Sequence, residues 1–468
     1  MTTPLLTTKL YPPPLRSDWV SRSRLLDRLN ACLTPDRRLA LVAAPAGYGK
    51  TTLVAAWGKY QAAASSTRLA WLSLDADDNA ISRFLRYVLA ALNQVTPDLD
   101  AGVQMMLSAP EPAPPKAILT ALINDMAQID RQIVLVLDDY HVIEARQIHE
   151  AVTFLLEHLP QSLRVVLVSR ADPLLPIHRW RARRQIVEVR ADDLRFTQEE
   201  TAAFLGHADV PPLVSEDVAA LTERTEGWPR GLQLAVLALR EQAATEAQTF
   251  IRDFSGSHRY VLDYLLEEVV NRQPPVVQRF LLATSILERL NVSLCDAVIG
   301  RRADDAPEES TLRFEGTPLA NSRDVLTHLE RANLFVVPLD DERRWYRYHH
   351  LFAQVLQAFL RRMLGKEGEI PLHTRAAEWY ETHGEVNEAF KHAVAAEDFE
   401  RAARLIEENW LRVGHAGRMY VIRQWLDAMP EDVVRGRPLL SLVYAWALWL
   451  TGQIDAVEPH LDDADAGW

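Results

Sequence analysis

The stretch Ala44-Pro-Ala-Gly-Tyr-Gly-Lys-Thr-Thr52 decides the fold of the first part of this chain. It follows the apolar run Leu39–Ala43 and precedes Leu53–Trp57, whose composition favours a helix. A strand, a glycine-containing loop and a helix start form the geometry that holds phosphate groups in P-loops. Ala44 stands where the GxxxxGK[ST] pattern has glycine, so a glycine-containing turn followed by a chance Lys-Thr is the alternative interpretation.

The residues of this loop have the chemistry that a bound nucleoside triphosphate requires. Gly47 and Gly49 allow backbone N–H groups to turn inward around phosphate oxygens. The Lys50 ammonium can reach the β and γ phosphates, and the Thr51 hydroxyl is placed to hold Mg²⁺. We therefore expect ATP or ADP with Mg²⁺ to bind along the loop, with Lys50 also acting in catalysis. The binding residues would be Ala44, Pro45, Ala46, Gly47, Tyr48, Gly49, Lys50, Thr51 and Thr52.

A second motif, Ile133-Val-Leu-Val-Leu-Asp-Asp139, supports this interpretation. Five consecutive apolar residues predict a strand buried on both faces, and acids at its carboxyl end lie at the mouth of a parallel sheet. This is a Walker B pattern, in which we expect Asp138 to hold Mg²⁺ and Asp139 to orient or deprotonate the attacking water. Taken alone, the run would also fit a buried strand that ends in a polar turn.

Strand-like and helical patterns alternate through the first part of the chain. Alternation at this spacing predicts an α/β P-loop NTPase fold, a parallel sheet with helices on both faces. After Leu194 helical periodicity replaces the strand signals, so helical domains are expected there. The expected strands are Leu39–Ala43, Ala70–Leu74, Ile133–Leu137, Arg164–Val168 and Ile186–Val189.

The fourth expected strand ends in Leu167-Val-Ser-Arg170. A cation at that position would sense or stabilise the γ-phosphate, so Arg170 is a candidate catalytic residue. The alternative is a solvated strand-end arginine that precedes the turn Asp172-Pro173.

Length, charge and cysteine content restrict the class of protein. A chain of 468 residues holds about three domains, and a net charge of −13 argues against a protein that coats nucleic acid nonspecifically. Cys32 and Cys295 have no disulfide or zinc spacing, which fits a reducing compartment. Neither a secretory start nor a run of about 18 apolar residues occurs, so a cytoplasmic protein without membrane contact is expected.

Several stretches together resemble the MalT-type ATP-dependent LuxR-family transcriptional activators, a branch of the STAND signal-transduction ATPases. They run over most of the chain and are far more selective together than any one alone. This family tolerates a small residue at the position of Ala44. The matching stretches are Thr8–Pro14, Val20–Arg22, Pro45–Thr51, Trp71–Asp75, Leu137–Tyr140, Glu226–Pro229 and Tyr346–Phe352.

The resemblance implies further nucleotide contacts. Val20 and Arg22 correspond to the segment that lies against the base and ribose, although Ser21 replaces the usual glycine. Pro229 matches a proline that packs on the adenine. His349 matches the histidine of a winged-helix domain that reaches the β-phosphate of ADP and locks the resting state, with the neighbouring His350 as the alternative register.

The resemblance and the residue patterns predict five segments. They are an N-terminal arm (1–19), a P-loop ATPase domain (20–192), a helical lid (193–245), a winged-helix-like domain (246–364) and truncated TPR-like helical repeats (365–468). Beyond Arg361, small and bulky apolar residues recur at helical spacing, as in paired-helix repeats. An unrelated helical bundle is the alternative.

Two functions remain open on this basis. The first is a signal-dependent switch with weak ATPase activity: ATP and an inducer promote self-association and transcription, whereas ADP holds the resting state. The inducer, a small molecule or a protein, would act through the helical repeats, and DNA would bind only through a C-terminal helix-turn-helix that lies beyond Trp468. The second is a STAND-type scaffold that regulates an effector without a DNA-binding domain, such as a kinase.

Overall fold

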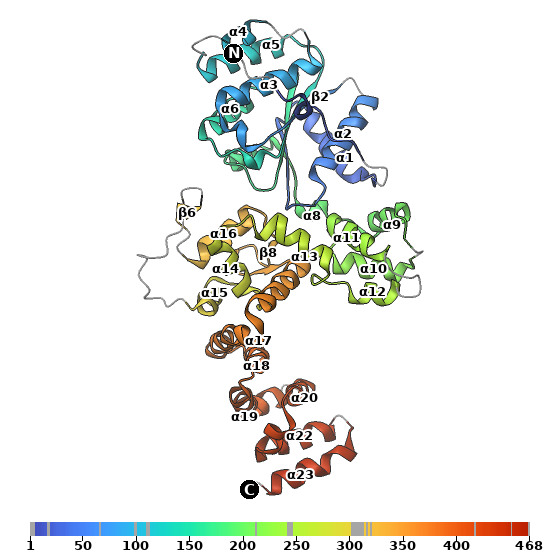
Figure 1. Cartoon of the computed structure of the whole chain (residues 1–468), viewed down its shortest axis with the longest axis vertical. Helices are drawn as coiled ribbons and strands as arrows, with labels where there is room; N and C mark the ends of the chain where they lie inside the picture. Colours follow the sequence, from blue (N-terminus) through green and yellow to red (C-terminus); the bar gives the residue numbers. More distant parts are fainter. Residues whose placement is uncertain are drawn as a thin grey trace. The chain divides into compact units, whose positions relative to one another are not determined.

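The computed structural model of the chain forms two compact units, one made of residues 1–269 with 328–335 and the other of residues 270–327 with 336–468. Figure 1 shows a sheet flanked by helices in the amino-terminal part of the chain and helices alone toward the carboxyl end. The structure describes residues 5–15, 19–64, 67–97, 101–108, 113–210, 213–240, 247–300, 313–314, 317–318, 321–415, 418–450 and 452–466.

A five-stranded parallel sheet is the centre of the first unit. Its spatial order is β2-β3-β4-β1-β5, so the strand that precedes the P-loop lies between β4 and β5. The register pairs Ala43 with Ser169 and Ser73 with Asp138, which brings the carboxyl ends of the strands to one edge. The strands are β1 (Leu39–Ala43), β2 (Arg68–Ser73), β3 (Ile133–Asp138), β4 (Leu163–Ser169) and β5 (Ile186–Val189).

The sheet is apolar on both faces because helices cover both. Every residue of β1, β3 and β4 is buried, which explains why these strands appear in the sequence as apolar runs without alternation. Figure 1 shows α1 and α2 on one side of the strands and α3, α5 and α6 on the other. The expected α/β P-loop fold is therefore confirmed.

The expected strands differ from the observed ones only at their ends. β1 and β5 have the expected bounds, whereas β2 begins two residues earlier and ends before Leu74. The backbone N–H of Leu74 nevertheless donates to the carbonyl of Asp138 at 3.0 Å. This bond joins the end of β2 to the end of β3.

The helices of the sheet domain precede β1 or lie between successive strands. They are η1 (Thr7–Leu10), α1 (Ser23–Asn30), η2 (Ala31–Leu33), α2 (Lys50–Ala64), η3 (Ala76–Asn79), α3 (Ile81–Val95), α4 (Ala101–Ser108), α5 (Pro115–Ala127), η4 (Tyr140–Val142), α6 (Arg146–Glu157) and α7 (Ile177–Ala182).

Among the described residues of the first unit, helices follow the sheet. The backbone N–H of Phe196 donates to the carbonyl of Gly227 at 2.7 Å, which joins the start of this region to the turn before α11. The helices are α8 (Ala191–Leu194), α9 (Gln198–His207), α10 (Ser215–Arg224), α11 (Pro229–Leu239), α12 (Ala247–Asp253), α13 (Arg259–Leu265) and η5 (Leu266–Val270), the last of which crosses into the second unit.

The second unit begins with three helices and a small antiparallel pair. Val336–Pro338 (β8) pairs with Tyr346–Tyr348 (β9), and Leu290 forms a bridge to Tyr346. The helices are α14 (Pro275–Thr284), α15 (Val292–Ile299) and α16 (Ser322–Arg331), the last of which crosses between the units. Two further short strands are β6 (Arg313–Phe314) and β7 (Thr317–Pro318).

The rest of the second unit is helical. Helix α17 (His350–Thr382) is broken at Gly365, whose φ is +67°. Successive helices then pack against one another, α17 on α18, α18 on α19, α20 on α22 and α22 on α23. These are α18 (Val386–Ala395), α19 (Phe399–His415), α20 (Met419–Asp427), α21 (Glu431–Arg435), α22 (Pro438–Leu450), η6 (Ile454–Ala456) and α23 (Val457–Ala466).

Within the part of the chain that the structure describes, no helix of either unit is long and apolar enough to cross a bilayer.

Candidate nucleotide-binding site

The loop between β1 and α2 has the backbone conformation of a phosphate-binding loop. Gly47 and Gly49 adopt φ values of +77° and +76°, a left-handed conformation that glycine reaches without steric cost. Helix α2 then begins at Lys50, so its unpaired N–H groups face the end of the loop. The expected strand, loop and helix are all present.

Lys50 lies inside the loop that it would serve. Lys50 is 7% exposed, and its ammonium donates a hydrogen bond to the carbonyl oxygen of Pro45 at 2.9 Å. Burial and the positive charge of Arg170 lower the pKa of Lys50 to about 8, against the opposing charges of Asp139 and Asp138. A negatively charged ligand would offset both effects, because it favours the protonated amine.

Thr51 and Asp138 bring two oxygen ligands together at the edge of the sheet. The Thr51 hydroxyl donates to Oδ1 of Asp138 at 3.0 Å, and Asp138 is buried. Burial and the charge of Asp139 raise the pKa of Asp138 to about 7, although the hydrogen bond from Thr51 opposes this. A hydroxyl beside a buried carboxylate is the hard oxygen donor set that suits Mg²⁺, so these residues fit the expected ion.

Asp139 turns the chain away from the sheet at the end of β3. It adopts φ +55° and ψ +37°, and its backbone N–H donates to Oδ1 of Asp138 at 3.1 Å. Its own carboxylate is 47% exposed, in contrast to the buried Asp138. The two acids therefore occupy different environments, and their separate roles stay a prediction.

Arg170 follows β4 at the same edge of the sheet. Its guanidinium is 30% exposed and lies 3.5 Å from the carboxylate of Glu268, while its backbone carbonyl accepts a hydrogen bond from Asn333 at 2.9 Å. Its positive charge contributes to the lowered pKa of Lys50. Contact with a γ-phosphate stays a prediction.

The start of α11 packs directly on the P-loop, a contact that sequence reasoning missed. The indole N–H of Trp228 donates to the carbonyl of Ala46 at 3.2 Å, and the backbone N–H of Arg230 donates to the carbonyl of Gly47 at 3.1 Å. Pro229 is the first residue of the helix and is buried. In the sequence, the Gly-Trp-Pro stretch is the signal for this contact. It predicted an adenine contact for Pro229 and no partner for Trp228.

The Arg22 side chain is hydrogen-bonded to other groups of the protein. It is 6% exposed, its Nε donates to Glu200 at 3.2 Å and its Nη2 donates to the carbonyl of Arg195 at 2.8 Å. Burial lowers its pKa against the opposing charge of Glu200, and its guanidinium lies 4.8 Å from the ring centroid of Phe196. Arg22 thus ties the residues before α1 to the segment before α9. A ribose or base contact by Arg22 and the buried Val20 stays a prediction.

His349 belongs to the second unit, where it is the residue before α17. It is buried, whereas His350, the first residue of the helix, is exposed. The contact of either histidine with a nucleotide stays a prediction.

Two known domain families match parts of this chain. Residues 18–168 match the family described as AAA ATPase domain, and residues 266–367 match the MalT winged helix domain. A Walker-type ATPase of Pyrococcus abyssi has a similar structure, with a TM-score of 0.49 and 15% identity over 75% of this chain and 100% of that chain.

Two curated relatives extend over almost the whole chain. The HTH-type transcriptional regulator MalT of Serratia proteamaculans is 33% identical over 462 residues, which cover 98% of this chain and 48% of that protein. The serine/threonine-protein kinase PknK of Mycobacterium tuberculosis is 32% identical over 471 residues, 99% of this chain and 40% of that protein. The chain spans less than half the length of each. It is therefore a relative of the MalT-type ATPase regulators, with an AAA ATPase domain followed by a MalT winged helix domain.

Proposed function

We propose that this chain is a nucleotide-dependent switch that binds ATP or ADP with Mg²⁺ at the P-loop and hydrolyses ATP slowly. The observation that carries the proposal is the meeting of Lys50, Thr51 and Asp138 at one edge of the sheet, with a hydrogen bond between Thr51 and Asp138. An ammonium, a hydroxyl and a carboxylate, the groups that phosphate and Mg²⁺ require, thus lie together. Thr51 and Asp138 are nevertheless 87 positions apart in the sequence.

The chemistry of each residue follows from its environment. Lys50 and the N–H groups at the start of α2 would hold the phosphates by charge-assisted hydrogen bonds. Mg²⁺, when bound by Thr51 and Asp138, supplies neutralisation of phosphate charge. The half-exposed Asp139 would orient the attacking water or accept its proton, and Arg170 would stabilise negative charge on the γ-phosphate. A slow reaction of this kind would act as a timer.

The state of the nucleotide would set the state of the protein. ATP together with an inducer bound to the helical repeats would promote self-association, and ADP would hold the resting form. A ligand shifts such an equilibrium only by its difference in affinity for the two forms. Similarity to MalT over 98% of this chain supports transcription as the output, and DNA contact would then belong to a C-terminal domain.

The second candidate function is control of a different effector, such as a kinase. Similarity to the kinase PknK over 99% of this chain favours it as strongly as the MalT match favours transcription. The region shared with both relatives is the switch, so the effector domain decides between the two outputs. Sequencing the whole gene and assaying the encoded effector would separate them.

The nucleotide site is tested by two substitutions with separate effects. Lys50→Ala should weaken ATP binding by roughly 10- to 150-fold, because it removes a charge-assisted contact worth about 1.5–3 kcal/mol. Asp139→Asn should leave ATP affinity nearly unchanged and slow hydrolysis by roughly 100-fold or more. Calorimetry measures the first effect and phosphate release the second.

Lys59→Ala is the matched control, since Lys59 is an exposed lysine on the same helix α2. This control variant should bind and hydrolyse ATP as the parent does. Equal ATP affinity of Lys50→Ala and the parent would refute the P-loop assignment. Parental hydrolysis by Asp139→Asn would show that the Asp139 carboxylate has no catalytic part.

A further inference from the structure

The amino-terminal arm packs against the carboxyl end of β2, next to the candidate site. Residues Thr7–Leu10 form the short helix η1, and Lys9 and Leu10 are 7% and 5% exposed. The stretch Thr8–Pro14 has no part in the proposed function. A lysine that is more than nine-tenths buried outside the nucleotide loop requires a physical reason.

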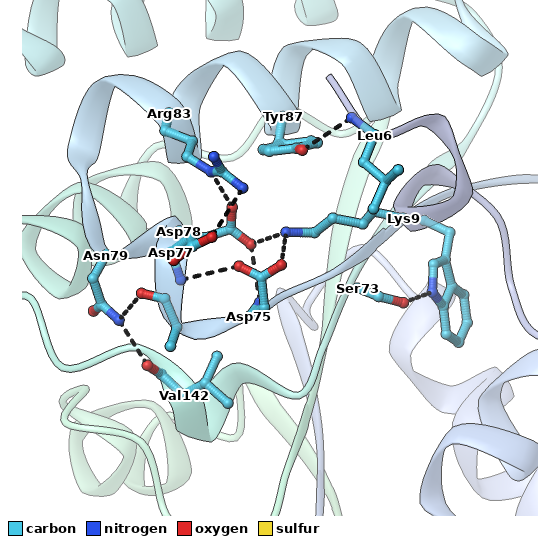
Figure 2. Close-up of polar contacts among 12 residues, drawn as sticks. Leu6, Lys9, Ser73, Asp75, Asp77, Asp78, Asn79, Arg83, Tyr87 and Val142 are labelled. Atoms are coloured by element: carbon cyan, nitrogen blue, oxygen red, sulfur yellow. Dashed lines mark hydrogen bonds and ion pairs between the residues drawn. The ribbon is translucent and has the colours of Figure 1, made fainter. Parts of the chain in front are cut away.

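Lys9 is held by two carboxylates and an aromatic ring (Figure 2). Its ammonium donates to Oδ2 of Asp75 at 2.9 Å and forms an ion pair with Asp78. It also lies 4.4 Å from the ring centroid of Tyr87, whose hydroxyl accepts a hydrogen bond from the backbone N–H of Leu6 at 3.1 Å. These contacts fix the arm on the turn after β2 and on α3.

Asp78 is the centre of this cluster and is fully buried. It accepts a hydrogen bond from the backbone N–H of Asp75 at 2.9 Å, which caps η3, and another from Nε of Arg83 at 3.0 Å. Removal of the Lys9 charge would therefore leave Asp78 with one cation, so the domain should still fold. The arm, in contrast, would lose its only ion pairs described in the structure.

The residue after Asp78 connects this cluster to the turn that follows Asp139. The amide nitrogen of Asn79 donates to the carbonyl of Val142 at 2.8 Å. Its amide oxygen accepts from the backbone N–H groups of Glu144 at 2.7 Å and Ala145 at 3.0 Å. One side chain thus satisfies three backbone groups of the turn.

We propose that Lys9 is a positioning residue for the catalytic carboxylate Asp139, an inference that rests on the proposed ATP hydrolysis. Lys9 holds Asp78 and with it η3, and Asn79 on η3 holds the turn 142–145, which begins three residues after Asp139. Asp139 itself adopts a left-handed backbone conformation that depends on its surroundings. The arm is therefore part of the hydrolytic machinery, whereas Lys50 and Thr51 are hydrogen-bonded to Pro45 and Asp138.

This arrangement predicts a loss of turnover without a loss of binding. In the full 468-residue chain, Lys9→Met keeps the apolar stem and removes the charge. Its rate of ATP hydrolysis at saturation should fall about tenfold, because a displaced catalytic group costs rate steeply. Its ATP affinity should stay within about twofold of the parent, because Lys50 and Thr51 are unaffected.

Two further variants separate positioning from folding. Asn79→Ala removes the link to the turn and leaves the Lys9 ion pairs, so it should slow hydrolysis in the same way. Lys59→Met removes a charge from an exposed lysine of the same domain and should behave as the parent. Thermal unfolding of each variant shows whether that variant is folded. If Lys9→Met does not fold, Asn79→Ala tests the inference through the link between η3 and the turn.

Amide hydrogen exchange gives a readout that does not depend on hydrolysis. The amides of Glu144 and Ala145 should exchange faster in Lys9→Met and Asn79→Ala than in the parent, because their acceptor is displaced or absent. The amides of β5 (Ile186–Val189), at the opposite edge of the sheet, should be unchanged.

Each outcome either supports or overturns the positioning role of Lys9. Unchanged exchange at Glu144 and Ala145 in Lys9→Met overturns the inference, as does faster exchange with parental turnover. A fall in ATP affinity as large as the fall in turnover also overturns it, since the damage would then be general. If the parent itself binds ATP but hydrolyses none, the proposed ATPase activity has failed and the positioning role fails with it. If the parent binds no ATP, the switch proposal fails first.

Discussion

At the scale of single residues, two glycines of the P-loop have the same backbone conformation and different surroundings. A Cβ atom on Gly47 would lie 2.5 Å from Cβ of Arg230 and 3.0 Å from the indole nitrogen of Trp228. A Cβ atom on Gly49 would meet nothing within 4 Å. Gly47 is thus required both by its φ and by the close approach of α11, whereas Gly49 is required by φ alone.

Alanine substitutions should separate these two requirements. Gly49→Ala should cost about 1–2 kcal/mol of unfolding free energy, the penalty for a left-handed alanine. Gly47→Ala should lose about 1–3 kcal/mol more, since the added methyl group overpacks the contact with Arg230. Urea-induced unfolding without nucleotide measures both. Equal losses would show that α11 moves away without cost.

At the scale of elements, α17 and α18 are joined by two histidines. The Nδ1 atoms of His373 and His392 lie 2.8 Å apart, and the ring of His392 stacks on Tyr380 at an interplanar angle of 10°. Burial, the neighbouring His373 and the charge of Lys391 lower the pKa of His392 to about 3 from an ordinary 6.5. Burial lowers the pKa of His373 as well, so both imidazoles are neutral in the folded pair at physiological pH.

This pair should make the packing of α17 on α18 sensitive to acid. Because the folded pKa of His392 is lowered, the unfolded chain takes up its proton first, so the pair's contribution to stability is complete above about pH 6.5 and is lost toward about pH 3. The thermal midpoint should fall over this range, and His392→Gln should reduce the fall. His415→Gln, at an exposed histidine that ends α19, is the control. A pH profile identical in parent and His392→Gln would contradict this account.

At the scale of the whole molecule, the proposed switch needs a residue of the second unit that distinguishes ADP from ATP. The resemblance assigns this part to His349. A hydrogen bond to a charged phosphate is worth about 1.5–3 kcal/mol, which corresponds to a coupling of roughly 10- to 150-fold. Such a coupling is large enough to bias a two-state protein whose forms differ by a few kcal/mol.

His349→Ala should therefore weaken ADP binding more than ATP binding, by about 10- to 150-fold. Equilibrium titration of both nucleotides gives this ratio, and His350→Ala is the paired variant at the exposed neighbour. If only His350→Ala changes the ratio, the register is off by one residue. If neither variant changes it, the histidine latch is absent from this chain.

Local sequence was sufficient to predict the strands and the P-loop of the ATPase domain. The bounds of β1 and β5 were predicted as they are observed, and β3 extends one residue past its expected end, to Asp138. The physical reason is that burial on both faces favours a run of apolar residues, and the left-handed conformations of the P-loop favour glycine. Both requirements act within a few residues, so they are visible in the sequence. The five segment boundaries and the roles of individual site residues stay predictions.

Tertiary structure alone decided which distant groups meet. The order β2-β3-β4-β1-β5, the bond of Trp228 to Ala46 across 182 residues and the ion pair of Lys9 with Asp78 have no signature in local periodicity. A buried lysine and a surface lysine look alike in a sequence, because burial of a charge depends on a partner that only folding supplies. Lys9 appeared in the sequence as one residue of an amino-terminal arm, and its connection to the turn after Asp139, through Asp78 and the neighbouring Asn79, arises only once β2 and β3 lie side by side.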